Sequence, residues 1–247
     1  MSRQLLLLAT AVQFLTRLPV PAPGWEEDRL ARAMRWFGAV GLLVGALTGA
    51  LWWAASLALP APVAAGLAIA GGIWLTGALH EDGAADTADA LGGHASRERA
   101  LEIMRDSRIG TYGAAALIVS VGLRWAALAS LSPVEGALAL VIAHSASRGL
   151  MVPATRLARY ARPSGTAQGM GAGVGIVEIL LALAPGLIVA ALVAPQTLVV
   201  VALGAGAGVL ILGLLVRRLG GYTGDGLGAI QQAAEVTMMV ALAGLLR

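Results

Sequence analysis

The chain of 247 residues contains no cysteine and no lysine, and it has only three histidines. Without cysteine there is neither a disulfide framework nor a thiolate nucleophile, and three histidines are too few for a histidine-rich metal site. Charged residues make up 13% of the chain, against roughly 25% in soluble proteins. All 17 basic residues are arginine, and they are spread too thinly for nucleic-acid binding.

Apolar residues dominate the composition. Hydrophobic residues make up 58% of the chain, and its mean hydropathy is +0.80. A soluble fold of this length has too little interior to bury that much apolar surface, and the same numbers exclude an intrinsically disordered chain. The sequence therefore predicts an all-α, multi-pass integral membrane bundle that forms a single domain over residues 1–247.

Seven apolar stretches are long enough to cross a bilayer, whose hydrocarbon core of ~30 Å requires about 20 helical residues. These stretches are approximately Trp36–Leu59, Ala61–Leu79, Tyr112–Leu131, Val134–Val152, Val174–Ala194, Thr197–Val216 and Leu227–Leu246. An eighth stretch, Gln4–Val20, is shorter and contains Arg17, so it either spans the bilayer or lies in its interface. We expect seven spanning helices and one N-terminal membrane-associated helix.

The connections between these stretches differ in charge. Three are tight and uncharged, at residues 59–62, 131–133 and 194–196. The other four carry twelve arginines, namely Arg29, Arg32, Arg35, Arg97, Arg99, Arg105, Arg108, Arg156, Arg159, Arg162, Arg217 and Arg218. The positive-inside rule assigns arginine-rich connections to the cytoplasm. We therefore expect the longest connection, residues 80–113, to be a cytoplasmic catalytic loop.

Half of the chain's fourteen carboxylates lie in this connection, between Glu81 and Asp106. Asp82, Asp86 and Asp89 follow the spacing i, i+4, i+7, which places them within ~60° of one another on one helix face. Their like charges repel unless a cation lies between them. Mg²⁺ prefers carboxylate oxygens and shares its coordination with substrate phosphates. We therefore predict that these three residues bind Mg²⁺ and take part in catalysis; the alternative is a solvated acidic face.

An arginine-rich segment follows the acidic run. Ser96 is placed to cap a short helix, and Arg105, Ser107 and Arg108 come after it. Because the planar fork of arginine donors suits phosphate oxygens, we predict that these last three residues bind substrate. The alternative is that they anchor the cytoplasmic side and pair with neighbouring acids.

A second polar group begins the last apolar stretch. Asp225 lies just before that stretch, and Gln231 and Glu235 share one face of the expected helix. Polar groups in membrane helices usually face the bundle interior. We predict that Gln231, Glu235 and Arg148 bind substrate, with hydrogen bonding between helices as the alternative. We place Arg124 too far towards the outer side to belong to the site.

Four segments, in chain order, resemble one family. Gly77–Ala90 resembles the H-x-D-G-x-x-D-x-x-D signature of cobalamin synthase, adenosylcobinamide-GDP ribazoletransferase. Ala100–Gly113 is similar to its A-L-x-I-M-x-D-S-R-x-G-T-Y-G block, Gly221–Ala229 to its T-G-D-x-L-G-A block, and Phe14–Pro21 to an early segment. The similarity extends over the whole chain. Ala90 departs from the family, which has glycine there more often.

The resemblance implies a Mg²⁺-dependent transferase in a bacterial inner membrane, with its active site facing the cytoplasm. The family transfers alpha-ribazole, or its 5′-phosphate, onto adenosylcobinamide-GDP, which releases GMP and completes the nucleotide loop of vitamin B12. Asp106, Asp225 or His80 then accepts the proton of the ribazole hydroxyl. The resemblance leaves open whether the ribazole is phosphorylated and whether the chain forms a homo-oligomer.

Two other classes of membrane protein share an aspartate-rich pattern. One is a Mg²⁺-dependent phosphotransferase of the CDP-alcohol type or a prenyltransferase, against which the later two blocks of the resemblance argue. The other is a cation-coupled transporter, whose carboxylates would lie near the bilayer midplane. Here the acidic residues are expected in a cytoplasmic connection, which favours an enzyme.

Overall fold

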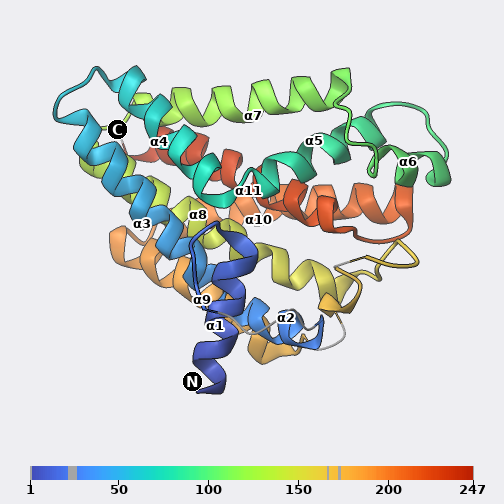
Figure 1. The fold of residues 1–247 in the computed structure, drawn as a ribbon. Helices are drawn as coiled ribbons and strands as arrows, with labels where there is room; N and C mark the ends of the chain where they lie inside the picture. Colours follow the sequence, from blue (N-terminus) through green and yellow to red (C-terminus); the bar gives the residue numbers. More distant parts are fainter. Residues whose placement is uncertain (1, 22–26, 166, 172–173, 247) are drawn as a thin grey trace.

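The computed structural model describes residues 2–21, 27–165, 167–171 and 174–246. Within these residues the chain forms helices joined by short connections and no β-strand (Figure 1). The helices are α1 (Arg3–Leu15), α2 (Glu27–Ala33), η1 (Met34–Trp36), α3 (Phe37–Ser56), α4 (Ala61–Thr76), α5 (Leu79–Gly92), α6 (Arg97–Ile103), α7 (Thr111–Ala129), α8 (Pro133–Leu157), η2 (Gly169–Gly171), α9 (Ile176–Val193), α10 (Thr197–Leu219) and α11 (Gly224–Leu245).

The seven apolar stretches all form helices, but fewer than seven of those helices qualify as spans. Five segments in the described part of the chain are long and apolar enough to cross a membrane: Arg29–Ser56, which ends with α3, and the helices α7, α8, α9 and α10. Helix α4 meets the same test only together with α5. Helix α11 is long enough, but its glutamines and Glu235 interrupt the apolar run. The expectation of seven spans is therefore not confirmed.

Helix α1 is too short to cross a bilayer by itself. Its 13 residues extend about 20 Å at 1.5 Å per residue, whereas the hydrocarbon core is ~30 Å thick. Helix α1 instead packs against the bundle, where the ring of Phe14 stacks on that of Phe37 with centroids 5.8 Å apart. The backbone N–H of Arg17 donates to the carbonyl of Leu75, so the chain after α1 lies beside the end of α4.

Two consecutive left-handed residues turn the chain sharply between α4 and α5. Gly77 ends α4 with a φ of 67°, and Ala78 follows with a φ of 58°. The left-handed conformation is accessible to glycine but costs an alanine roughly 1–2 kcal/mol, so packing around the turn has to maintain it. The two helices consequently meet at 88°, and α5 leaves the direction of the preceding helix.

After this turn, α5 runs back along α7 instead of forming an open loop (Figure 1). Glu81, near the start of α5, is bonded to Arg124, deep in α7, whereas Asp89, near its end, is bonded to Gly113, in the first turn of α7. The two helices are therefore antiparallel. Much of the expected catalytic loop is helix. Helix α5, which carries the acidic residues, is not one of the five spanning segments. Ser96 caps α6, as expected.

Helix α11 crosses the middle of the bundle and packs against α5, α7, α8 and α10 (Figure 1). Its crossing with α5 is close because both helices present glycine there. A Cβ added to Gly83 would lie 2.7 Å from the carbonyl oxygen of Asp225, and one added to Gly228 would lie 3.2 Å from that of His80. The backbones are thus in direct contact, which brings the two polar motifs together although they are far apart in the sequence.

Candidate active site

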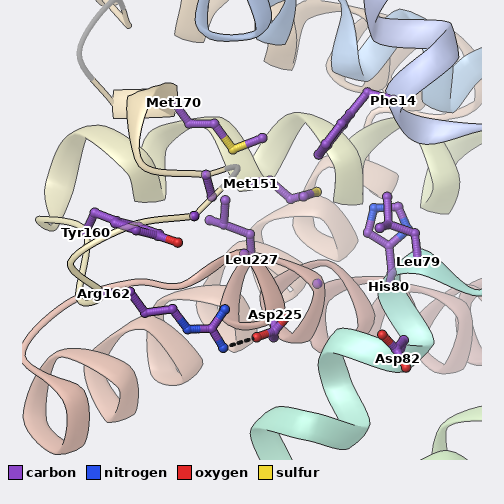
Figure 2. Close-up of a pocket in the computed structure, with 14 residues that line it drawn as sticks. Phe14, Leu79, His80, Asp82, Met151, Tyr160, Arg162, Met170, Asp225 and Leu227 are labelled. Carbon is purple, nitrogen blue, oxygen red and sulfur yellow. Dashed lines mark hydrogen bonds and ion pairs between the residues drawn. The ribbon is translucent and has the colours of Figure 1, made fainter. Parts of the chain in front are cut away.

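A cavity of about 340 Å³ opens where α5 and α11 cross. It is bounded by α1, α5, α8, α11 and the segment after α8 (Figure 2). One side carries charged groups, namely Asp82, Asp225 and Arg162, whose guanidinium is ion-paired with Asp225. The opposite side is apolar and includes Phe14 and Met170. The cavity therefore has a charged end and an apolar end.

Asp82 and Asp225 line the charged end from two helices, and Asp86 lies near both of them without lining the cavity. Asp82 is exposed and Asp86 half-buried on α5, while Asp225 lies in the first turn of α11. Burial, and then the neighbouring charges of Asp82 and Asp225, raise the pKa of Asp86 to about 6. Arg162 opposes this effect only in part. The group thus carries negative charge that a cation would stabilise.

Asp89 is held differently from the other two aspartates of α5. Its two carboxylate oxygens accept the backbone N–H groups of Gly110 at 2.7 Å and Gly113 at 2.8 Å. These amides belong to the N-terminus of α7, where negative charge is favourable. Because both oxygens are already engaged, Asp89 anchors the segment before α7 to the end of α5. Its role as a third metal ligand stays a prediction, and the two hydrogen bonds favour a structural role instead.

The carboxylates of Asp82 and Asp86 suit Mg²⁺, which needs only a few protein ligands, better than they suit an ion that the protein ligates completely. In the described residues, no group of three or more His, Cys, Asp or Glu side chains is arranged to hold a metal. Mg²⁺, however, is commonly bound by one or two carboxylates together with waters and substrate phosphates. Asp82 and Asp86 offer such a pair beside the cavity. Magnesium binding stays a prediction, now with two protein ligands.

The segment between α6 and α7 faces solvent. The guanidinium of Arg108 donates to both carboxylate oxygens of Asp106 and lowers the pKa of that carboxyl to about 2. Asp106, Ser107 and Arg108 do not line the cavity. The structure therefore does not place Asp106 where a base would meet a substrate hydroxyl in that cavity.

A second, cationic cavity of about 510 Å³ adjoins the first. Tyr160 and Arg162 line both cavities. Arg97, Arg105 and Arg159 add three more guanidinium groups to its wall. Arg97 and Arg159 are held by backbone carbonyls of the α10–α11 turn, at Leu219 and Gly220. Of the arginines predicted to bind phosphate, the structure thus places Arg105, but not Arg108, in a cavity adjoining the acidic group.

The other predicted substrate-binding residues are buried in an ionic cluster on the far side of α5. Arg124 donates to Glu81 at 3.0 Å and to Glu235 at 2.8 Å. Glu235 also contacts His144 at 2.9 Å and Arg148 at 3.4 Å. We refer to these five residues as the ionic cluster.

The ionic cluster has no room for a ligand. The space among its side chains is about 10 Å³, about the least that a single water molecule requires, and Arg148 and Glu235 are each 2% exposed. Gln231, which is fully buried, donates to Glu235 as well. In this structure Arg148, Gln231 and Glu235 thus form the hydrogen bonds between helices that the alternative expects, and their contact with substrate stays a prediction.

Sequence reasoning missed two residues that line the cavity, Tyr160 and Arg162. Arg124 lies outside the cavity, as expected, but nothing in the sequence indicates that α5 carries Glu81 back to the depth of Arg124. Arg162 and Tyr160 lie in a connection whose arginines indicate only topology. No motif marks them, and only the turn that follows α8 brings them to Asp225.

Comparison with known proteins places the whole chain in one family. The family model described as cobalamin-5-phosphate synthase matches residues 7–243. A relative from Bradyrhizobium diazoefficiens is 46% identical, covering 96% of this chain and 92% of the relative. Relatives from Shewanella baltica and Leptothrix cholodnii are each 41% identical over 93% of this chain, and cover 90% and 92% of their own lengths.

All three relatives are named adenosylcobinamide-GDP ribazoletransferase. No solved structure matches the chain. The paired motifs that meet at the α5–α11 crossing, Gly77–Ala90 and Gly221–Ala229, both lie within the matched range. The protein belongs to the cobalamin-5-phosphate synthase family.

Proposed function

We propose that this protein transfers alpha-ribazole, or its 5′-phosphate, onto adenosylcobinamide-GDP. The ribazole hydroxyl oxygen forms a bond to the phosphorus next to the cobinamide, and the bond from that phosphorus to the GMP oxygen breaks. The hydroxyl proton passes to a base, and GMP leaves with the electron pair of the broken bond. The product is adenosylcobalamin or its 5′-phosphate.

One observation carries this proposal beyond the family name. The crossing of α5 and α11 brings Asp82 and Asp225 to one cavity, with Arg162 beside them (Figure 2). Transfer of a phosphoryl-type group requires charge neutralisation and positioning more than covalent participation by the protein. A cavity with carboxylates, a guanidinium and an apolar end supplies both, whereas the ionic cluster has no space for substrate.

Each residue of the charged end has a proposed role. Asp225 accepts the proton of the ribazole hydroxyl, since Asp106 lies outside the cavity, and His80, which also lines it, lies away from Arg162 (Figure 2). Arg162 donates to phosphate oxygens when the substrate displaces its contact with Asp225. Asp82 and Asp86 hold Mg²⁺, which supplies charge neutralisation for the phosphates. The guanidinium groups of the second cavity bind the guanosine diphosphate portion.

The proposed location is the bacterial inner membrane, with the cavity open to the cytoplasm. Five apolar helices support a multi-pass membrane protein. The four arginine-rich connections include those that carry Arg105 and Arg162, and arginine-rich connections are cytoplasmic by the positive-inside rule. Nucleotide substrates are available on that side.

Detergent-solubilised protein tests the reaction directly. The protein is incubated with adenosylcobinamide-GDP and alpha-ribazole, with Mg²⁺ or with excess EDTA, and GMP and corrinoid products are separated by chromatography. We expect equal amounts of GMP and new corrinoid, formed only with Mg²⁺. Folded protein that forms neither product, with ribazole or with its 5′-phosphate, would overturn the proposal. Solute uptake by sealed vesicles without product formation would indicate a transporter instead.

A further inference from the structure

The apolar end of the cavity has a composition that the proposed phosphate chemistry does not explain. Phe14, Met151, Met170 and Leu227 line it, and Figure 2 shows them on the side away from Arg162 and Asp225. Flat side chains and flexible thioethers of this kind pack well on aromatic rings. The end is therefore suited to an uncharged aromatic group.

His80 is the polar exception beside this apolar end. Its side chain is 1% exposed, lines the cavity and lies near Leu79 and Phe14 (Figure 2). Neither ring nitrogen has a hydrogen-bond partner among the described residues. A buried polar group without a partner is costly. Both nitrogens are shielded from water as the ring lies here, so a rotation of the ring towards the cavity would let a ligand with one hydrogen-bonding atom at its edge remove that cost.

We propose that the apolar end binds the benzimidazole ring of ribazole, with the N–H of His80 donating to the ring nitrogen that carries no sugar. This inference rests on the proposed function and adds to it the assignment of one substrate to one part of the cavity. The ribose then extends towards Asp225 and Arg162, where the hydroxyl reacts.

The chemistry of the wall distinguishes ribazole from the other groups that the reaction brings together. Guanine carries several donors and acceptors along its edges, and an apolar wall with a single imidazole would leave most of them unpaired. A corrin ring is several times larger than benzimidazole and does not fit in about 340 Å³ together with its side chains. Benzimidazole has one free ring nitrogen and otherwise apolar edges, which matches a single polar group.

A competition between two acceptors tests the contact. Alpha-ribazole and an analogue in which the free ring nitrogen is replaced by C–H, an indole nucleoside, are mixed in equal amounts with adenosylcobinamide-GDP. The ratio of the two corrinoid products gives the ratio of their kcat/KM values within one tube. That ratio is independent of the amount of folded enzyme, so a variant that folds poorly still reports it.

We expect the wild-type protein to prefer ribazole over the indole analogue by roughly three- to tenfold, the size of one net hydrogen bond. His80→Leu should reduce the preference to about onefold, because the donor is lost. His80→Gln, whose amide can donate, should retain part of it. His144→Gln is the matched control: this histidine is buried in the ionic cluster, and its variant should keep the wild-type ratio.

Two results would overturn the inference. The first is a wild-type preference that His80→Leu leaves unchanged, which would separate the ring nitrogen from His80. The second is a His80→Leu variant in which KM for adenosylcobinamide-GDP increases and KM for ribazole is unaffected. This result would assign the cavity to adenosylcobinamide-GDP. Both differ from failure of the proposed function, in which the wild-type protein forms no corrinoid product from either acceptor.

Discussion

Glu81 and Asp82 are neighbours on α5, yet their carboxylates lie in opposite surroundings. Glu81 points into the bundle, where Arg124 neutralises it, and its side chain is 9% exposed. Asp82 is exposed and lines the cavity, and no ion pair of Asp82 is found in the described part of the chain. One face of α5 thus carries a carboxylate that is paired with an arginine, and the other carries a carboxylate that is free to bind a ligand.

The difference separates the structural role of charge from its proposed chemical role. A buried carboxylate is tolerated only when it is paired and hydrogen-bonded. The ionic cluster pairs both Glu81 and Glu235 with Arg124, and of the oxygens of these two carboxylates only Oε2 of Glu81 has no hydrogen-bond partner among the described residues. Carboxylates that repel one another beside a cavity have no such structural use. The following variants test this division of α5, beginning with the largest expected effect.

Asp82→Asn should reduce turnover by about 10³-fold, comparable to the loss of one essential electrostatic group. Folding should be unaffected, since Asp82 is exposed and its charge repels that of Asp86. GMP release measures turnover, and thermal unfolding in detergent, followed by tryptophan fluorescence, measures stability. Full activity in Asp82→Asn would remove this residue from the site. Lost activity with a lowered unfolding temperature would place it with the structural charges.

Arg124→Met should lower the free energy of unfolding by about 3–5 kcal/mol, because Glu81 would stay buried without a cation and Glu235 would keep only His144 and Arg148. The same fluorescence measurement reports the change. Arg124→Met combined with Glu81→Gln should recover part of the loss, since one unpaired charge is removed with the arginine. Equal stability of the single variant and the wild-type protein would contradict the structural role of the ionic cluster.

Asp86 and Asp89 allow a comparison within the acidic face itself. Asp86→Asn should raise the Mg²⁺ concentration for half-maximal activity roughly tenfold, through loss of one of two carboxylate ligands. Asp89→Asn should leave that concentration unchanged, because Asp89 bonds to the backbone of Gly110 and Gly113. Its effect should instead be faster tryptic cleavage in the segment before α7. A raised Mg²⁺ requirement in Asp89→Asn would restore it as a metal ligand.

The positions of the helices can be predicted from the lengths of the apolar stretches and from the capping residues. The site, in contrast, depends on the direction that the turn between α4 and α5 gives to α5. The acidic helix α5 and the cap of α6 at Ser96 were predictable from local spacing. The left-handed conformation of Ala78 was not, because alanine carries no preference for it. Without that turn, the depth of Glu81 beside Arg124 and the contact of Gly83 with Asp225 could not be foreseen.

The smallest loss of stability is expected for a carboxylate that bonds only within its own helix. Glu135 and Ser132 form a capping box at the start of α8, in which Ser132 accepts the backbone N–H of Glu135 and Glu135 accepts that of Ser132. Glu135→Ala should lower the free energy of unfolding by about 0.5–1 kcal/mol, the usual size of a capping contribution, and leave turnover per folded molecule unchanged. The same fluorescence and GMP assays apply. A loss of turnover comparable to that of Asp82→Asn would show that charge outside α5 also serves the reaction, and the division drawn from Glu81 and Asp82 would then fail.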